Sequence, residues 1–486
     1  MSSEEKISPA RSRTRGGPFD QLRAPSPSRG SVLIIVMWIC LGLVALTLYF
    51  AGSMSSELHA ADNRVNEIAA RQAIAGATRY AAYVLTQYAT GGVVPKIEDY
   101  KAEAVPVGDA SFWFIGRDTG GQQLQLQPQQ VQNQPYFALV DESSKLNLNT
   151  VTSAMLQALP LPDMTPDFAD AIVAWRSANS ANAATLENIY SQLPVPRHNK
   201  GAPYESVDEL RLINGAMLDL VLGEDTNRNG VLDPNEDDGE LSAPRDDQNG
   251  VLLAGLFEYV TVYSSQPATS AAGARRINVT TLNTQQPRQH LQQRLTQAGI
   301  QAQRAAQIMA RIPFNPNQNP NQPQAAAPTS VADFMVTTQM TAEEFALIHT
   351  DLTATANGVT PGLVNVNTAS AAVLGSIPGI GPDNAAMLVA YRTSNPDALT
   401  SMAWLTTAGL SAGGIRRAGP YITDHSYQFS ADIAAVGANG RGYCREKVVF
   451  DTSTGKPRIV YRQDLTAYGW ALGTETRRSI RANQDI

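Results

Sequence analysis

Apolar residues form one uninterrupted run near the beginning of the chain, over residues 31–54. No residue is charged from Val32 to Ala51, and a helix needs about 20 such residues to span a bilayer. Beyond this run, apolar residues recur every three or four positions from Leu58 to Val84, as they do on one face of a helix. The pattern predicts a single helix over residues 31–90, with a transmembrane part followed by a stalk.

Two later parts of the chain show the alternation that is typical of strands. Short strands are predicted at 111–115, 136–140 and 257–263, and a β-meander is predicted after residue 425. Residues 141–424 are mostly helical in pattern. The predicted fold is therefore α+β: a pilin-like long N-terminal helix plus an antiparallel sheet. Residues 91–140 supply the first part of the sheet, residues 425–486 supply the last part, and 141–424 form a large inserted α-helical domain.

The inserted region contains an internal repeat. LNLNTVTSAMLQALP at 146–160 aligns with VNVNTASAAVLGSIP at 364–378, and a weaker third copy begins with INVTT at 277–281. Each copy has the pattern helix, tight connector, helix. The connector PGIG (378–381) suits a hairpin, because glycine readily adopts positive φ. We place the two clear repeats at 141–220 and 361–424. They resemble SAM-like or helix-hairpin-helix units.

A calcium-binding loop is the most specific motif, at residues 225–236 with the sequence DTNRNGVLDPNE. It fits the twelve-residue EF-hand pattern, with a glycine, Gly230, at the sixth position. The predicted ligands, all oxygens, are Asp225, Asn227, Asn229, the carbonyl of Val231, Asp233 and Glu236. Such ligands suit Ca²⁺. The alternative is an acidic turn without a metal. DDGELSAP after the loop does not predict an exit helix.

Composition argues against nucleic acid as a ligand and against catalysis. The formal net charge is −7, with 44 acidic and 37 basic side chains, whereas affinity for nucleic acid depends largely on Lys and Arg. The five histidines are scattered without metal-binding spacing, and Cys40 and Cys444 are too far apart in the predicted topology to pair. We find no pairing of a nucleophile with a base. We therefore expect a protein that is not an enzyme.

The segment before the apolar run indicates how the protein is processed. Residues 1–30 are polar and basic and end in Arg29-Gly30, directly before the apolar helix. This is similar to the leader that prepilin peptidase removes on the cytoplasmic side, which implies cleavage between Gly30 and Ser31. Basic residues before a span stay in the cytoplasm. Most pilin-like proteins have Glu at the fifth mature position, but here that residue is Ile35.

These features together resemble the minor pseudopilin K family of type II secretion. The resemblance is carried by Gly30 before the helix, the absent Glu, DESSKLNLN (141–149), YESVDELRLINGA (204–216), the VNVNT repeat and the closing strands. It implies a single-pass protein of the bacterial inner membrane with most of its chain in the periplasm. It also implies bound calcium, N-terminal methylation and a structural role in a tip complex with minor pseudopilins I and J. The alternative function is a membrane-anchored DNA-binding protein of a competence-like uptake system, which would use the hairpin at 378–381.

Overall fold

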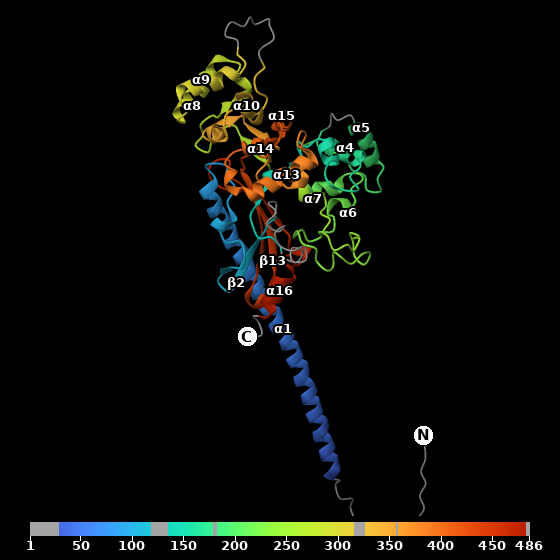
Figure 1. Ribbon diagram of the computed structural model, residues 1–486. Helices are drawn as coiled ribbons and strands as arrows, with labels where there is room; N and C mark the ends of the chain where they lie inside the picture. Colours follow the sequence, from blue (N-terminus) through green and yellow to red (C-terminus); the bar gives the residue numbers. More distant parts are fainter. Residues whose placement is uncertain (1–28, 118–134, 178–181, 315–325, 356–357, 483–486) are drawn as a thin grey trace, which may run out of the picture. The chain divides into compact units, whose positions relative to one another are not determined.

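The computed structural model describes residues 29–117, 135–177, 182–314, 326–355 and 358–482 (Figure 1). The chain divides into two compact units, residues 1–62 and 63–486. In the first unit the described residues belong to helix α1 (Arg29–Tyr88). By length and composition, α1 is apolar enough to cross a membrane, and it is the one such helix among the described residues. This confirms the predicted long N-terminal helix. Most of the predicted leader lies outside the described residues.

An antiparallel sheet forms the centre of the second unit. Its strands are β1 (Val105–Val107), β2 (Ala110–Ile115), β3 (Val140–Asp141), β12 (Gln428–Val436), β13 (Cys444–Asp451) and β14 (Arg458–Asp464). Their order is β1-β2-β12-β13-β14, and β3 pairs with β12. The chain therefore leaves the sheet after β3 and returns to its middle with β12, so strands distant in sequence are neighbours. The predicted mixed α+β fold, with a long helix and an antiparallel sheet, is confirmed.

The part of α1 within the second unit packs on one face of this sheet. Alanines at spacings of three and four, Ala70, Ala73, Ala77 and Ala81, are fully buried. Small side chains let the helix backbone approach a layer of aromatic and β-branched residues, which comprises Phe112, Phe114, Phe429, Val448 and Phe450. A separate cluster on the other face joins Trp113 and Ile115 to Leu472, just before α16 (Gly473–Ala482). Both faces of the central strands are thus covered.

The region between β3 and β12 contains three helical segments that begin and end alike. Each begins with a two-residue strand ending in Asn, which pairs in parallel with a two-residue strand ending in Thr. The pairs are β4 (Leu146–Asn147) with β5 (Val260–Thr261), β7 (Ile277–Asn278) with β8 (Leu352–Thr353), and β10 (Val364–Asn365) with β11 (Ile422–Thr423). We call these helical segment 1 (146–261), helical segment 2 (277–353) and helical segment 3 (364–423).

The same hydrogen bond explains the asparagine that recurs in the first strand of each segment. The side-chain oxygens of Asn147, Asn278 and Asn365 each accept the backbone N–H two residues later, at 2.8, 3.0 and 2.9 Å. Asn side chains favour such turns because they satisfy a backbone donor locally. Helical segment 2, of which the sequence shows only a weak copy at 277–281, therefore has the same local construction at its start.

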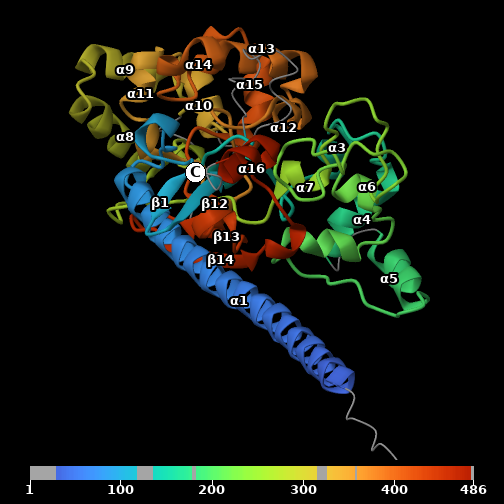
Figure 2. The ribbon, with the colours of Figure 1, turned by 90° about the horizontal axis from the view of Figure 1, so that it is seen from below.

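The helices of the three segments share one hydrophobic core. Segment 1 has α3 (Ser153–Gln157), α4 (Pro166–Trp175), α5 (Ala183–Ser191), α6 (Leu218–Val221) and α7 (Leu256–Tyr259); segment 2 has α8 (Gln285–Gln297), α9 (Ala302–Arg311), α10 (Val331–Thr338) and α11 (Ala342–Ala346); segment 3 has α12 (Ala371–Ser376), α13 (Gly381–Ser394), α14 (Trp404–Thr407) and α15 (Ala412–Ala418). A short antiparallel pair, β6 (Ser265–Pro267) with β9 (Val359–Pro361), lies between segments. In both views the helices of segments 1 and 2 lie on opposite sides of those of segment 3 (Figures 1 and 2).

Two predicted strands differ from the structure. The stretch 257–263 was expected to be extended, but it begins within α7, and only Val260 and Thr261 pair with β4. Leu256 and Phe257 are buried in the helical core, so tertiary packing overrides the β-propensity of the aromatic run. At 136–140 only the last residue belongs to β3, and Phe137 makes an isolated bridge to Ile115.

Candidate metal centre

The loop 225–236 lies in helical segment 1 and contains no helix or strand. The residue two positions before the loop, Gly223, has a φ of +66° and forms an isolated antiparallel β-bridge with Ala254, so the chain before the loop and the chain after it lie side by side. A Cβ on Gly223 would lie 2.2 Å from the carbonyl oxygen of Leu253, so a larger residue is excluded there. Within the loop, the sharp turn falls on Gly230, with φ of +78°. The backbone therefore turns at the position that the motif assigns to glycine.

The five predicted side-chain ligands are brought together in one hydrogen-bond network. The amide nitrogens of Asn227 and Asn229 donate to Oδ2 of Asp233, at 2.7 and 3.0 Å. Backbone N–H groups of Asn229 and Gly230 donate to the two carboxylate oxygens of Asp225, at 2.9 and 2.8 Å. All five side chains belong to buried residues. The sequence therefore folds its polar oxygens into the interior of the loop.

Glu236 closes the loop onto its own beginning. Its Oε1 accepts the backbone N–H groups of Thr226 and Asn227, at 2.9 and 3.2 Å, and its Oε2 accepts that of Asp233, at 3.1 Å. Val231 is buried, and its N–H donates to Oδ1 of Asn229 at 2.8 Å. The last residue of the motif thus ties both halves of the loop together.

Three buried carboxyl groups in one loop oppose ionisation. Burial raises the pKa of Glu236 to about 7, against the hydrogen bond from Thr226. Burial also raises the pKa of Asp233, and that of Asp225, where Arg117 at 3.7 Å opposes the rise. Raised carboxyl pKa values reflect the cost of removing negative charge from water. A cation bound among these oxygens would remove that cost.

Two arginines attach the loop to the sheet. The guanidinium of Arg445, on β13, is fully buried; it donates to the carbonyls of Asn227 and Arg228 and forms an ion pair with Asp432 of β12 at 2.6 Å. Arg117, which follows β2, donates to the carbonyl of Arg228 at 3.0 Å and to Glu258 at 2.8 Å. The loop backbone is therefore held by charged side chains from the edge of the central strands.

The donor set of the loop fits Ca²⁺. It offers three carboxylates and two amide oxygens, which are hard ligands, and includes neither sulfur nor imidazole. The amide oxygens of Asn227 and Asn229 each accept one backbone N–H and retain a second lone pair. Asp225, Asn227, Asn229, Val231, Asp233 and Glu236 are the residues that would hold the ion.

The other predicted site residues belong to the first unit. Gly30, Ser31 and Ile35 lie in the first turns of α1. Ile35 is 58% exposed, so the described residues of its own unit leave more than half of its surface uncovered.

The connector predicted at 378–381, in the helix-hairpin-helix unit, joins α12 to α13. Gly379 and Gly381 have φ of +93° and +73°. A Cβ on Gly379 would lie 2.5 Å from the carbonyl oxygen of Gly414 in α15, so this glycine serves close packing between helices. Asp383, in the first turn of α13, is exposed and would repel a phosphate. Gly379 is therefore explained by packing without a ligand, and Gly381 by its positive φ.

A further cluster, His349, Asp424 and His425, was not predicted. The histidines had been expected to be scattered, yet two of them meet around one carboxylate. The adjacent pair Asp424-His425 is the one local signal, and His349 lies 75 residues before Asp424. The sequence could not reveal the third member.

Comparison with known proteins finds similarity to one family model and to solved structures. Residues 359–407 match the family model described as a helix-hairpin-helix motif. Among solved structures, the chain is similar to one in the crystal structure of the GspK-GspI-GspJ complex from the type 2 secretion system of enterotoxigenic Escherichia coli. The identity is 10% and the TM-score 0.32, with 81% of this chain and 96% of the other covered. No curated protein sequence matches.

Proposed function

We propose that this protein is a minor pseudopilin, a structural tip subunit of a type II secretion pseudopilus that supports protein export across the outer membrane. The observation that carries the proposal is helix α1 and its partner sheet. An apolar segment that is able to span a bilayer belongs to the same helix as the alanine face buried on the antiparallel sheet. A subunit of this construction can be anchored in the inner membrane and can pack by its helix in a filament, with residues 63–486 in the periplasm.

The beginning of the chain supports processing by prepilin peptidase. Arg29-Gly30 directly precedes the apolar run, and cleavage between Gly30 and Ser31 would leave the helix as the mature N-terminus, which the same peptidase would methylate. Ile35 then occupies the position at which most pilin-like subunits have Glu. Because an unpaired buried ammonium is costly, a subunit without that carboxylate gains little by joining beneath another. The large region 141–424 would also obstruct a subunit stacked above it. Both features favour a single position at the tip.

Calcium is the proposed cofactor, held by the loop 225–236. The ion would supply positive charge to three buried carboxyl groups and so fix the conformation of a loop that Arg445 and Arg117 attach to the sheet. We infer a structural role for the ion and for the protein as a whole, without catalysis. The two SAM-like repeats would be residues 141–220, which overlap helical segment 1, and residues 361–424, which contain helical segment 3.

Co-purification tests the proposed function. The full-length chain is expressed with the I-type and J-type minor pseudopilins of the same bacterium, extracted in detergent and purified through a tag on the J-type subunit. All three are expected in one complex of fixed stoichiometry. A matched control replaces the tagged subunit with the major pseudopilin. Recovery of this chain equally with both baits, or with neither, would contradict the proposed partners.

A second candidate function is favoured by the helix-hairpin-helix match at 359–407. In this view the protein is a membrane-anchored DNA-binding protein of a competence-like uptake system. Its affinity would fall steeply with salt, and Arg417, next to Gly379, would contribute. Fluorescence anisotropy with labelled duplex DNA decides between the candidates. Salt-sensitive binding that weakens in Arg417→Ala, with Arg458→Ala as the control, would support DNA uptake.

A further inference from the structure

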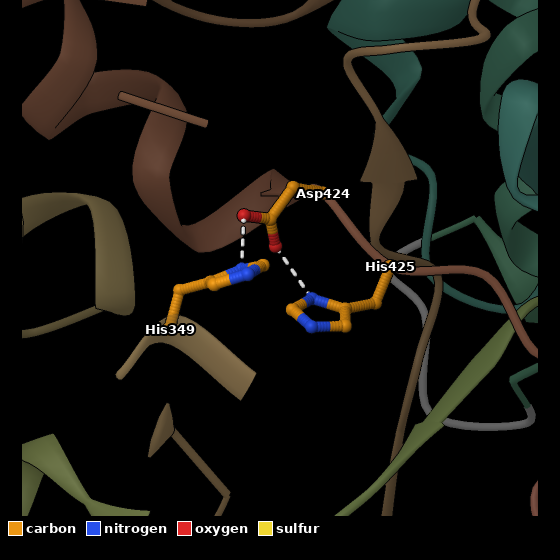
Figure 3. A group of neighbouring side chains, drawn as sticks. All are labelled: His349, Asp424 and His425. Carbon is orange, nitrogen blue, oxygen red and sulfur yellow. Dashed lines mark hydrogen bonds and ion pairs between the residues drawn. The ribbon is translucent and has the colours of Figure 1, made fainter. Parts of the chain in front are cut away.

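A buried cluster of two histidines and one aspartate lies between helical segment 2 and the sheet (Figure 3). His349 begins the 3₁₀ turn His349–Asp351, directly before β8. Asp424 and His425 lie between β11 and β12. The cluster therefore joins the end of segment 2 to the chain where it re-enters the central sheet.

The carboxylate lies between the two imidazole rings. Nδ1 of His349 is 2.9 Å from Oδ2 of Asp424, and Nδ1 of His425 is 2.5 Å from its Oδ1. The two ring centroids are 4.9 Å apart, and Figure 3 shows both rings turned toward the carboxylate. One ligand atom from each residue lies within 4.8 Å of the other two. The three side chains thus converge on a common volume.

The ring of His425 is buried, and one of its nitrogens has no partner among the described residues. The side chain is 4% exposed, and its Nδ1 forms a close ion-pair contact with Asp424. Its Nε2 has no hydrogen-bond partner in the described part of the chain. A buried polar atom left unsatisfied costs about 1–3 kcal/mol, so such atoms in native structures call for an explanation. A bound metal ion, which would accept the lone pair of a His425 nitrogen, is one such explanation.

A backbone hydrogen bond holds the Asp424 carboxylate in place. Its Oδ2 accepts the backbone N–H of Met402, at 2.8 Å. Met402 belongs to helical segment 3, so this segment sets the orientation of the carboxylate between the two imidazole rings.

The cluster opens on a cavity of about 220 Å³ that is lined by both apolar and polar residues. The polar ones include five threonines, which are Thr329, Thr353, Thr355, Thr360 and Thr423. Gln266 adds an amide. A volume of this size admits several waters, so it leaves room for a non-protein ligand beside the three side chains.

We propose that His349, Asp424 and His425 bind one divalent transition-metal ion, for which Zn²⁺ fits best. Two imidazole nitrogens and one carboxylate oxygen are a donor set that zinc accepts, with the fourth position taken by water from the cavity. The ligand atoms of a tetrahedral zinc site are about 3.3 Å apart, given metal–ligand distances of about 2.0–2.1 Å. The contacts of the two histidines with the carboxylate, 2.9 and 2.5 Å, are shorter than this spacing by less than about 1 Å, and the ligand atoms of the three residues lie within 4.8 Å of one another.

This site differs in chemistry from the calcium loop. The loop offers oxygen ligands alone, whereas two of the three groups here are imidazoles, which Zn²⁺ prefers and Ca²⁺ does not. A bound ion would cross-link helical segment 2 to the first residues before β12 and so restrain that segment against the sheet. The two sites can therefore be occupied and tested separately.

The test uses the full-length chain, purified in detergent without a polyhistidine tag and stripped with a chelator. Co²⁺ is the spectroscopic probe, because its visible bands intensify in four-coordinate sites, and Zn²⁺ displaces it. One equivalent of Co²⁺ is expected, and about 2 mM Ca²⁺ should not displace it. His349→Gln and His425→Gln should each weaken binding by about 100-fold or more, since even the loss of a residue that only orients a metal ligand costs about 10–100-fold. His290→Gln, an exposed histidine on α8, is the matched control, and Glu236→Gln should also bind normally.

Equal cobalt affinity in His349→Gln, His425→Gln and His290→Gln would overturn the proposal, as would an absence of cobalt bands in the parent. X-ray absorption of the zinc-loaded parent protein needs no variant and covers the case in which the histidine variants fail to fold. Two imidazoles in the zinc shell are expected. A shell of oxygens alone would show that the three side chains form a hydrogen-bonded cluster without a metal.

Discussion

Replacing Glu236 with glutamine removes one of the three buried carboxylates of the loop 225–236 and keeps the shape of the side chain. In the structure both carboxylate oxygens accept backbone N–H groups, at 2.9, 3.2 and 3.1 Å. A glutamine amide has only one acceptor oxygen, so its NH₂ group would face a donor. We expect Glu236→Gln to lose calcium binding while the chain still folds, because the change is confined to one loop.

The magnitude follows from mass action. Extracellular sites of this class have Kd on the order of 10⁻⁴–10⁻³ M. With about 2 mM Ca²⁺, binding to the folded state alone raises the free energy of unfolding by roughly 0.6–1.8 kcal/mol. For a chain of this size that is a shift of a few °C or less in melting temperature. The lost hydrogen bond costs about 1–2 kcal/mol with or without calcium, so only the difference between the two conditions reports on the ion.

Melting of the detergent-solubilised chain is measured with about 2 mM Ca²⁺ and with a chelator. The parent should show the calcium-dependent rise, and Glu236→Gln should lose most of it. Glu240→Gln is the control, because it makes the same change in charge at an exposed position four residues later. Mg²⁺ at the same concentration should stabilise less. An equal rise in the parent and in Glu236→Gln, or no rise in the parent, would refute the assignment of this loop.

Three other predictions concern pH, packing and processing. Burial raises the pKa of Asp141 to about 6, against the hydrogen bonds from Ser426 and Thr368. The folded state therefore holds the proton of this carboxyl more tightly than the unfolded state does. The protonated carboxyl contributes roughly 2–3 kcal/mol to stability below about pH 4, and this contribution is lost as pH rises through about 6. Urea unfolding at pH 4.5 to 7 should show this slope in the parent and not in Asp141→Asn, and identical slopes would contradict it. Gly379→Ala should lower the free energy of unfolding by about 2–4 kcal/mol, because its Cβ would meet Gly414 and Arg417. Gly413→Ala is the control; it has open space around it and should be neutral or stabilising by up to about 1 kcal/mol. Similar effects of the two substitutions in thermal unfolding would count against the packing role of Gly379. Intact-mass analysis of membrane-extracted protein should give a chain that begins at Ser31, and a mature chain still carrying residues 1–30 would exclude cleavage by prepilin peptidase.

Local patterns allowed the long helix and the sheet to be predicted. The alanines of α1 recur at helical spacing, and the residues of β2, β12 and β13 alternate toward two covered faces. The stretch 257–263 misled the same reasoning, because Phe257 fills a helical core and Glu258 pairs with Arg117 at 2.8 Å. Those contacts come from distant parts of the chain, so the composition of the stretch does not encode them.

The two candidate metal sites differ in how far the sequence reveals them. The predicted ligands of the loop 225–236 are close together in the sequence, so their spacing alone predicts that they converge, and the hydrogen bonds among Asp225, Asn229 and Asp233 have that arrangement. The cluster of His349 with Asp424 depends on parallel pairing of strands only two residues long. Such strands leave no periodicity in the sequence, and the fold alone brings these residues together.

Immunogold labelling of assembled filaments tests the proposed function most directly. Antibodies against residues 425–486, which the deletion variant keeps, would be applied to pseudopili assembled from the natural set of subunits. An antibody against the major pseudopilin is the control that labels the whole shaft. The account predicts label for this protein at one end of each filament, once per filament. Label distributed along the shaft, or normal assembly after deletion of residues 141–424 with the shortened protein present throughout, would contradict the assignment to the tip.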